Sequence, residues 1–500
     1  MKRTSSNWRP GNSRSGSGRP TALGLRNGAD TRPRPSRVDS WRPPGNAGAM
    51  ADPERMHMID SLWLDLVQAD GPVAVGGVFE FRGKPPALAK IRGRIAEILP
   101  ESPRLRQIPM HSRTGVLQPK WQEAEPDLTH HVTRRAIAVG GLEGEISRML
   151  TLAMPTDTPL WDITVLTGYA PKEWALVWRL HHSVADGEGV TMLVGRALDM
   201  APEGGMTLTD ALVAQAAAWR AERGGAKDRA VDAGDRLRNA LTGAFADAAA
   251  VAYAAPDTVR ALLRMAPGRP SELSGAPGKG RDWRHLHLPL ADVKAAGKRQ
   301  GATINDVIMA GVTNGFRQVL IAQGSDPDGR EVRAIMPVSR RVPGDTRSNN
   351  QVSAMPIALP VGIEDPIERL ERVVEQTQQG KKSMAPALIG AVEDTVSKVV
   401  PAPLQEFVVA RTGWSTAWMT DTLVTNVRGA AVPQYFCGQE VRYLSPIIPI
   451  ASSLRTVVGI NSYNGSLNIS VTGDAEHAAD DKLLLAGIAA GIDELMALGD

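Results

Sequence analysis

The sequence predicts an α/β protein built from two domains of similar size. Segments that alternate like strands and segments with helical periodicity follow one another along most of the chain, and neither type dominates. A length of 500 residues exceeds one ordinary domain. The apolar fraction of 42% and the charged fraction of 22% are typical of a globular protein with a sizeable core. We therefore expect four parts: residues 1–49, 50–200, 201–282 and 283–500.

The first part reads as a disordered basic arm. Residues 1–49 are rich in Arg, Ser, Gly and Pro and hold too few large apolar side chains to offset the cost of ordering. Residues 1–50 contain ten Arg and Lys and two Asp. The positive formal net charge of the whole chain, +3, therefore comes from this arm, and the rest of the chain is acidic. The body therefore gives no case for nucleic-acid binding. We expect Met50 to be the true start; an arm that touches anionic lipid or RNA is the alternative.

In the 50–200 domain, helices and strands lead up to a pair of histidines. Apolar residues recur at helical spacing after Pro86, and alternation predicts the strands. The expected elements are a short helix or turn over 58–66, a strand over 73–81, a helix over 86–99, a loop-and-strand region over 103–121, a helix over 142–152, a strand over 159–168, a strand through 174–180 and a helix over 190–198.

Residues 201–282 change character and predict a helical connector. Ala, Gly, Arg and Asp dominate, and one apolar helical face runs from residue 237 to 248. We expect this face to pack on the body, with a lipid surface as the alternative. The 283–500 domain is then expected to hold strands over 285–290, 333–341, 422–428, 454–463 and 466–472, and helices over 290–300, from 305 onward, 365–379, 388–400 and 480–498.

The cysteine count and the hydropathy pattern suggest a cytoplasmic protein. Cys437 is the single cysteine, so no intramolecular disulfide can form, and we expect it to be a packed core residue. No apolar run is long enough to span a membrane, and no apolar segment of a secretory signal follows the basic N-terminus. Membrane association, if present, would be peripheral.

The stretch from Leu180 to Gly187 is the strongest candidate for a functional site. A strand ends on His181 and His182, and Asp186-Gly187 follows four residues later. Successive strand residues face opposite sides, so only one imidazole can project into a given cavity. Imidazole titrates near neutrality, which suits a general base. Asp186 could hold the loop or orient His182, and Gly187 permits a positive φ or a close backbone approach.

Other chemistry at this turn has less support from the sequence. The spacing lacks an HExxH pattern and His130-His131 is remote, so we predict no metal. A Ser-His-Asp hydrolase needs a GxSxG turn, which is absent, and Ser183 does not replace it. Two packed core histidines at a turn fit the spacing as well as a catalytic site does.

Resemblance to a known family favours catalysis. His181 to Gly187 resembles the HHxxxDG motif of the CoA-dependent acyltransferase superfamily, found in condensation domains and in bacterial wax ester synthase/acyl-CoA:diacylglycerol acyltransferases. Further blocks over residues 55–500 resemble the latter, in the same order. They are Asp60-Ser-Leu-Trp-Leu64, Pro159-Leu-Trp161 with Gly168, Asn305-Asp-Val-Ile-Met-Ala310, Met336-Pro-Val-Ser-Arg340, Asn349-Asn-Gln351, Thr425-Asn-Val427 and Ser462-Tyr-Asn-Gly465.

The resemblance implies two chloramphenicol-acetyltransferase-like domains with a tunnel between them. It implies His182 as the base (proton acceptor), His181 as support and Asp186 as a structural residue, with Gly187, Asn305 and Asp306 supporting the site or the bound substrate. The donor that stabilises the oxyanion is not assigned.

The implied reaction uses acyl-CoA as substrate, with no cofactor, and diacylglycerol or a long-chain alcohol as acceptor at a membrane or lipid-droplet surface. Departures from the family pattern at Asp157-Thr158, at Asn350 and in the long connector leave the acceptor open. Another hydroxyl or amine acceptor, or a non-catalytic lipid- or CoA-binding role, are the alternatives.

Overall fold

The structure, a computed structural model, describes most of the chain after the basic arm. The described residues are 54–56, 60–64, 72–111, 119–222, 271–339, 352–382, 420–450 and 453–498. They belong to one compact unit, Asp52–Asp500. The predicted disorder of residues 1–49, most of the predicted connector and the predicted helix over 388–400 lie outside the described residues.

A five-stranded sheet forms the centre of the first half. Its strand order is β13-β1-β6-β5-β4. The bounds are β1 Ala74–Arg82, β4 Val132–Ala136, β5 Trp161–Thr167, β6 Glu173–His181 and β13 Tyr443–Ile447. All neighbours pair antiparallel except β4 and β5. The strands predicted before the histidine pair are confirmed, whereas β13 comes from the second half of the sequence and was not predicted.

Helices and short strands surround this sheet. Buried Ile91, Ile95 and Ile98 recur at intervals of three or four residues, which explains why α2 packs one face inward. The elements are α2 Leu88–Ile98, η1 Leu99–Glu101, η2 Pro103–Arg106, β2 Gln107–Met110, β3 Lys120–Glu123, α3 Leu128–His131, α4 Leu142–Leu150, α5 Gly187–Gly195 and α6 Leu208–Glu222. Helix α5 starts three residues before the predicted position, directly at Gly187.

The second half contains a six-stranded sheet with the order β7-β15-β14-β10-β8-β9. The bounds are β7 Arg281–Pro289, β8 Val332–Ser339, β9 Val352–Leu359, β10 Thr422–Arg428, β14 Thr456–Tyr463 and β15 Ser466–Asp474, with the small hairpin β11 Tyr435–Phe436 and β12 Gln439–Glu440 outside it. β14 and β15 are joined at Asn464-Gly465, both with positive φ, as a tight two-residue hairpin requires. The predicted strands of this half are confirmed, and β9 was not predicted.

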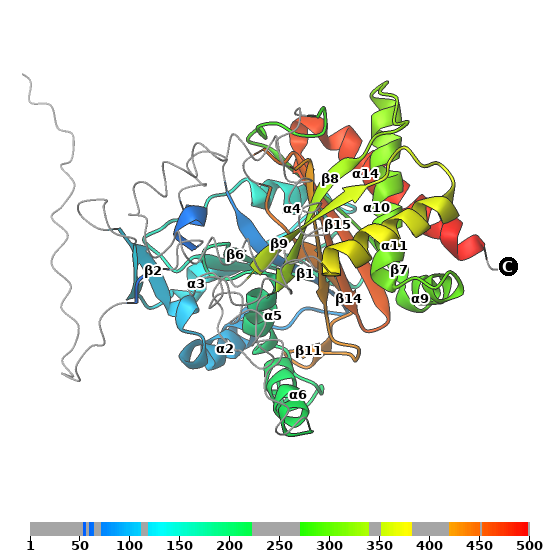
Figure 1. Ribbon diagram of the computed structural model, residues 1–500. Helices are drawn as coiled ribbons and strands as arrows, with labels where there is room; N and C mark the ends of the chain where they lie inside the picture. Colours follow the sequence, from blue (N-terminus) through cyan, green and yellow to red (C-terminus); the bar gives the residue numbers. More distant parts are fainter. Residues whose placement is uncertain are drawn as a thin grey trace, which may run out of the picture. The chain divides into compact units, whose positions relative to one another are not determined.

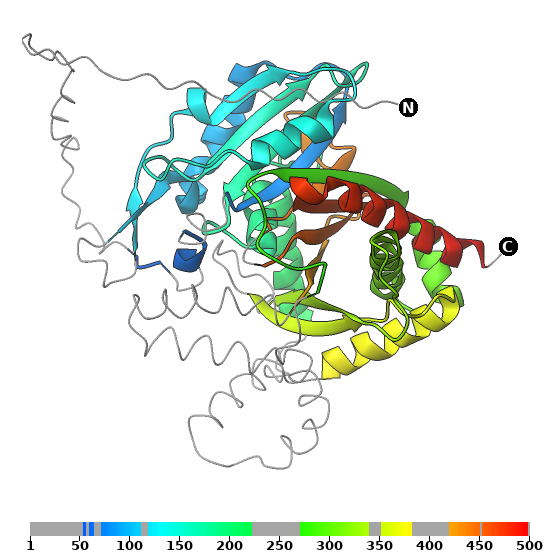
Figure 2. The same cartoon turned by 90° about the horizontal axis from the view of Figure 1, so that it is seen from above.

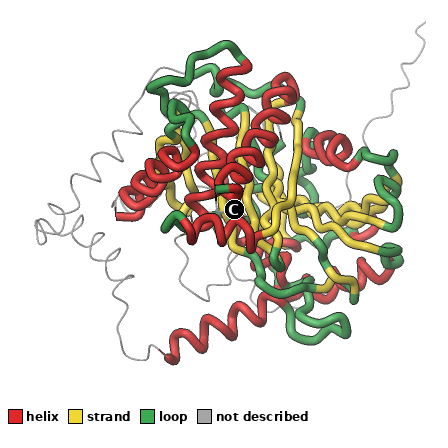
Figure 3. The backbone as a smooth tube through the Cα atoms, turned by 90° about the vertical axis from the view of Figure 1, so that its right-hand side faces the viewer, coloured by secondary structure: helices red, strands yellow, loops and turns green. Residues whose placement is uncertain are grey.

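Four helices cover one face of the six-stranded sheet (Figures 1 and 3). They are α9 Leu290–Arg299, α10 Ile304–Ala322, α11 Pro366–Lys382 and α14 Ala478–Ala497, which follows η3 Ala475–His477. Figure 2 shows α14 (red) running along the edge strand β7 (green). Helices α10 and α14 pack closely because glycines meet: a Cβ on Gly487 would lie 2.8 Å from the Cα of Gly315. No helix among the described residues is long and apolar enough to cross a membrane.

Candidate active site

The histidine pair lies at the end of a central strand. His181 is the last residue of β6, and its backbone N–H donates to the carbonyl of Leu160 at 2.9 Å. The N–H of His182 donates instead to the carbonyl of Val73, on the other neighbouring strand, at 3.0 Å. The two backbone N–H groups therefore point to opposite neighbours, as in an extended strand, and we expect the two imidazoles to leave opposite sides of the chain. Only one of them can face a bound substrate.

His181 is a core residue. Its side chain is buried, and Nδ1 accepts the backbone N–H of Ser183 at 3.2 Å and lies 2.8 Å from the Ser183 hydroxyl. An accepting Nδ1 places the ring proton on Nε2. Burial, with a smaller contribution from neighbouring His182, lowers the pKa of His181 from 6.5 to about 3. The ring is thus neutral at physiological pH and fixes the turn, while its supporting role in catalysis stays a prediction.

His182 is the more accessible of the two. It is half-buried, and its ring stacks on Trp63 with 4.1 Å between centroids and 21° between planes. Its Nδ1 is shielded from solvent. Trp63 lies in the helical turn 60–64 and fixes the plane of the imidazole. The sequence pointed to Trp63 only as part of the Asp60–Leu64 block, and its contact with His182 was not predicted.

Asp186 begins helix α5. It is the N-cap residue, and its Oδ1 accepts the N–H of Gly189 at 2.7 Å, while its backbone carbonyl accepts the N–H of Val190 at 2.7 Å. Only 2% of the residue is exposed. A carboxylate at this position satisfies a free helical N–H and interacts favourably with the helix dipole. These contacts suit the predicted structural role of Asp186.

Gly187 is where the second half approaches the motif. Its φ is not in the left-handed region. A Cβ at this position would lie 3.3 Å from Cγ2 of Val427 on β10. Of the two reasons that the sequence offered for this glycine, the close approach is the one present in the structure.

Asn305 is connected to the motif through β10. Its Oδ1 accepts a hydrogen bond of 3.2 Å from the side-chain amide of Asn426. Asn426 and Val427 are consecutive in a strand, so their side chains leave opposite faces. Asn305 therefore braces the strand that carries Val427, rather than lying on the same face as Gly187.

Asp306 stabilises the start of its own helix, α10. Together with Thr303 it forms a capping box at the start of α10, and its Oδ1 accepts the hydroxyl of Thr377 on α11 at 2.7 Å. It is buried, with 3% exposed. The N-cap of α10 is Thr303. These contacts place Asp306 in the scaffold of the second half, and its predicted part in supporting the substrate stays a prediction.

Other sequence blocks that carry the family resemblance also form hydrogen bonds that stabilise the fold. The carbonyl of Leu160 receives the N–H of His181, and the indole N–H of Trp161 donates to the Leu105 carbonyl at 2.9 Å. The hydroxyl of Tyr463 accepts the N–H of Gln434 and donates to the Val441 carbonyl, both at 2.9 Å. Arg340 and Asn349–Gln351 lie outside the described residues.

Among the described residues, neither histidine of the motif belongs to a group of three side chains that could hold one metal ion. A group that could chelate a metal lies elsewhere, at Glu80, His285 and His287. The sequence showed the two histidines of β7, but did not connect them with Glu80.

Comparisons with known proteins agree with this architecture. The family model of the wax ester synthase/diacylglycerol acyltransferase catalytic domain matches residues 56–308, and that of the C-terminal domain of the same family matches residues 348–496. A probable diacylglycerol O-acyltransferase of Mycobacterium tuberculosis is 30% identical over 388 residues, 76% of this chain and 82% of the relative. A second, putative one from that organism is 26% identical over 433 residues, 86% of this chain and 87% of the relative.

Solved structures show the same fold. The wax ester synthase/diacylglycerol acyltransferase of Marinobacter aquaeolei VT8 matches with a TM-score of 0.61 at 19% identity, over 89% of this chain and 99% of the other. The first condensation domain of the CDA synthetase matches with a TM-score of 0.56 at 15% identity, over 90% and 97%. The predicted α/β class with two acyltransferase-like halves is confirmed.

The matches to both domain models of this family thus define an acyltransferase. The chain belongs to the wax ester synthase/diacylglycerol acyltransferase family. The predicted domain boundaries and the tunnel stay predictions.

Proposed function

We propose that the protein transfers a long-chain acyl group from acyl-CoA to the hydroxyl of diacylglycerol or of a fatty alcohol, with His182 as the general base. The observation that supports this most is the asymmetry of the histidine pair. His181 is buried with its Nδ1 occupied by Ser183, whereas His182 is half-buried and its ring plane is held by Trp63. A positioned, partly accessible imidazole is the group that the chemistry needs.

The reaction begins at Nε2 of His182, since Nδ1 is shielded. Nε2 accepts the proton of the acceptor hydroxyl while that oxygen forms a bond to the thioester carbonyl carbon. The tetrahedral intermediate then collapses, the carbon–sulfur bond breaks, and the CoA sulfur leaves with its electron pair. The imidazolium returns its proton to that sulfur, so the base is regenerated. Asp186 and His181 contribute by fixing the turn that carries the base.

The names of the relatives favour diacylglycerol as the acceptor. The proteins with 30% and 26% identity are described as diacylglycerol O-acyltransferases. Diacylglycerol resides in lipid phases, so we further propose that the protein works at the cytoplasmic surface of a membrane or lipid body. Vesicle flotation tests this: co-flotation should increase with diacylglycerol content, and equal recovery with and without lipid would contradict it.

The decisive assay measures CoA release from one long-chain acyl-CoA in the presence of diacylglycerol, fatty alcohol or both, with identification of the lipid products. His182→Ala should reduce turnover about 10²–10⁴-fold, the usual contribution of a general base. His130→Ala is the matched control, because its side chain is 85% exposed on the surface. Circular dichroism and melting temperature establish folding. Wild-type turnover in folded His182→Ala would refute the role of His182, and CoA release without any acylated product would refute the transfer reaction.

A further inference from the structure

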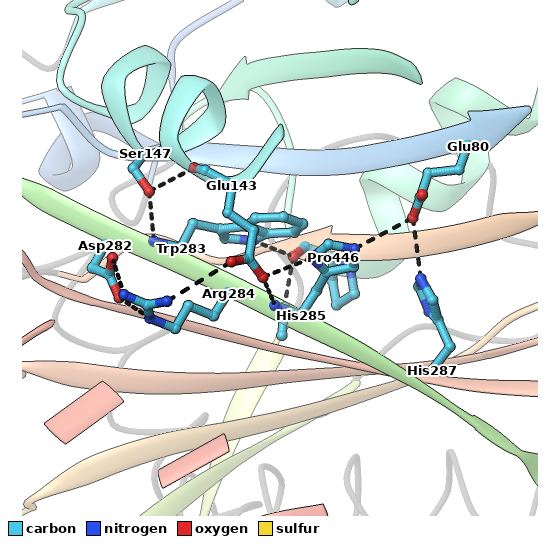
Figure 4. A network of polar contacts seen from close by, with 10 residues as sticks. Glu80, Glu143, Ser147, Asp282, Trp283, Arg284, His285, His287 and Pro446 are labelled. Atoms are coloured by element: carbon cyan, nitrogen blue, oxygen red, sulfur yellow. Dashed lines mark hydrogen bonds and ion pairs between the residues drawn. The ribbon is translucent and has the colours of Figure 1, made fainter. Parts of the chain in front are cut away.

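A second group of histidines lies on β7, facing Glu80 (Figure 4). His285 and His287 alternate along β7, so both side chains leave the same face of the strand. Glu80 approaches them from β1, in the sheet of the first half. Glu80 pairs with Ala175 on β6, six residues along from the pairing of Ala74 with His181. At about 3.3 Å per residue the group is about 20 Å from the motif, outside the proposed catalytic site.

The three side chains converge on one point. One ligand atom from each lies within 4.8 Å of the other two. Nε2 of His287 is 3.1 Å from Oε1 of Glu80, and Nε2 of His285 is 3.5 Å from the same oxygen. In a tetrahedral zinc site with bonds of about 2.0–2.1 Å, neighbouring ligand atoms are about 3.3 Å apart. The two nitrogen–oxygen separations therefore match those of zinc ligands, and the two histidine ligand atoms lie within 4.8 Å of each other.

The other nitrogen of each ring is held by an oxygen. Nδ1 of His287 lies 2.8 Å from Oδ1 of Asn468, and Nδ1 of His285 lies 3.2 Å from Oε1 of Glu143. The amide nitrogen of Asn468 donates to the carbonyl of Asn461 at 3.3 Å, which is consistent with its oxygen facing His287. With Nδ1 of each ring donating to these oxygens, Nε2 of each ring faces Glu80 and can either carry a second proton or bind a metal ion. This arrangement, in which a carboxylate or amide oxygen orients the ring, is typical of metal-binding histidines.

The Nε2 atoms of both rings therefore face the Glu80 carboxylate, and in neutral rings with the proton on Nδ1 they would present lone pairs to it. Two lone pairs and an anion at these distances repel one another unless positive charge lies between them. One divalent ion would neutralise Glu80 and Glu143 together. Glu143 also contacts Arg284, at 3.8 Å, and the His285 ring, at 3.2 Å. Two protonated imidazoles are the competing solution, and the experiment below distinguishes them.

Aromatic rings hold the histidines in place. The ring of His285 stacks on Trp283 at 4.7 Å, and that of His287 stacks on Tyr443 at 3.9 Å with 6° between planes. The indole N–H of Trp283 donates to the Pro446 carbonyl at 3.2 Å, and Tyr443 belongs to β13. The ligand set is therefore preorganised by strands from both sheets.

We propose that Glu80, His285 and His287 bind a zinc ion, with water completing the coordination, and that the ion clamps β1 to β7. Two imidazoles and one carboxylate form a donor set that zinc accepts. The role is structural, since the group is remote from His182. The sequence prediction of no metal rested on the spacing of the motif histidines and did not consider this group.

The test starts from full-length protein stripped of metal by a chelator and dialysed. Calorimetric titration with zinc should show one equivalent bound per chain, accompanied by a rise in melting temperature. Cobalt(II) in place of zinc should give the visible absorption of a tetrahedral site. Loss of a hydrogen-bond partner behind a metal ligand typically weakens metal binding about 10–100-fold. His287→Ala and Glu80→Gln remove ligands themselves, so each should weaken zinc binding by a larger factor. Glu80→Gln keeps the size of the side chain, so it reports on the site even if His287→Ala does not fold.

Two control variants exclude other zinc ligands. His130→Ala removes an exposed histidine beside Asp127, and His182→Ala removes a histidine of the motif. Both variants should still bind one equivalent of zinc per chain. The proposal is overturned if stripped wild-type protein takes up no stoichiometric zinc, the result expected for a purely protonated cluster. It is equally overturned if Glu80→Gln binds zinc as tightly as the wild type.

Discussion

Val427 and Gly187 come from opposite halves of the chain and lie in contact. Cγ2 of Val427 is 3.3 Å from the position that a Cβ on Gly187 would occupy. Gly187 is the first residue of the helix that follows the histidine pair, so this contact sets how closely β10 approaches the motif.

Gly187→Val should reduce stability by about 1–3 kcal/mol and reduce acyl transfer, because the added methyl groups displace β10. Gly187→Ala should have a smaller effect, since a shift of a few tenths of an ångström accommodates one methyl. Val427→Ala should restore part of the loss in a double-mutant cycle of urea unfolding and turnover. Gly144→Val is the control, because a Cβ on this helical glycine meets open space. Strict additivity of Gly187→Val and Val427→Ala would contradict the contact.

Asp186→Ala should destabilise the protein by about 1–2 kcal/mol and lower activity, because the N-cap bond to Gly189 is lost at the start of α5. Asp186→Asn retains an accepting oxygen and should lie closer to the wild type in unfolding free energy. Asp127→Ala removes a comparable cap, the 2.8 Å bond to the N–H of Thr129, on an exposed helix. It should cost stability without affecting acyl transfer. Equal turnover losses in the Asp127 and Asp186 variants would contradict this prediction, because general destabilisation, and not the place of Asp186 beside the histidine pair, would then explain the loss of activity.

Asn305→Ala should lower kcat about two- to tenfold, the equivalent of one hydrogen bond, because it loosens the strand that carries Val427. Asn426→Ala should have the same effect, and the double variant should be no worse than either single one. Steady-state kinetics with a fixed acyl-CoA measure this. Additive losses would mean that Asn305 acts independently of Asn426.

His181 should make the protein sensitive to acid. Its pKa falls from 6.5 to about 3 on folding, so the unfolded chain binds the proton more tightly between these values. Its contribution to stability is complete above pH 6.5 and decreases as the pH falls toward 3. His181→Asn keeps an acceptor near the position of Nδ1 but does not titrate. The melting temperature of the wild type should therefore fall more between pH 6.5 and 4.5 than that of the variant. Parallel curves would contradict the shift.

Asp481 has the opposite dependence. Burial raises its pKa from 3.8 to about 8, helped by Asp282 and Asp480, although Thr456 donates a bond of 2.8 Å to Oδ1. The folded state holds this proton more tightly, so the contribution to stability decreases as the pH rises from 3.8 to 8. Asp481→Asn resembles the protonated acid. Its melting temperature relative to the wild type should increase between pH 5 and 8.5, and a constant difference would refute the assignment.

The sequence predicted the elements whose pattern is local. The strand ending at His181 and the helix after Asp186 follow from an apolar run, a capping aspartate and a glycine. Strand β13 was missed because it has five residues, includes Pro446 and lacks an alternation of apolar and polar residues. Its partner β1 lies far away in the sequence.

Contacts between residues far apart in the sequence could not be predicted from local sequence patterns. The stacking of Trp63 on His182 joins residues more than a hundred positions apart, and the hydrogen bond of His287 to Glu80 spans 207 positions. The pair His285-x-His287 was visible, but neither the direction of its rings nor the nearby carboxylate could be read from spacing. Asn305 was identified by resemblance, whereas its partner Asn426 required the packing of α10 on β10.

Strand β13 also determines when the first half can finish folding during synthesis. Residues 443–447 pair with β1 from Gly76 to Glu80, on the side of β1 that β6 does not occupy. Until the ribosome has produced nearly nine-tenths of the polypeptide, that side of β1 exposes unpaired backbone groups, a state that invites aggregation. A nascent or truncated chain that stops before β13 should therefore depend on chaperones, even though the histidine turn has already been synthesised.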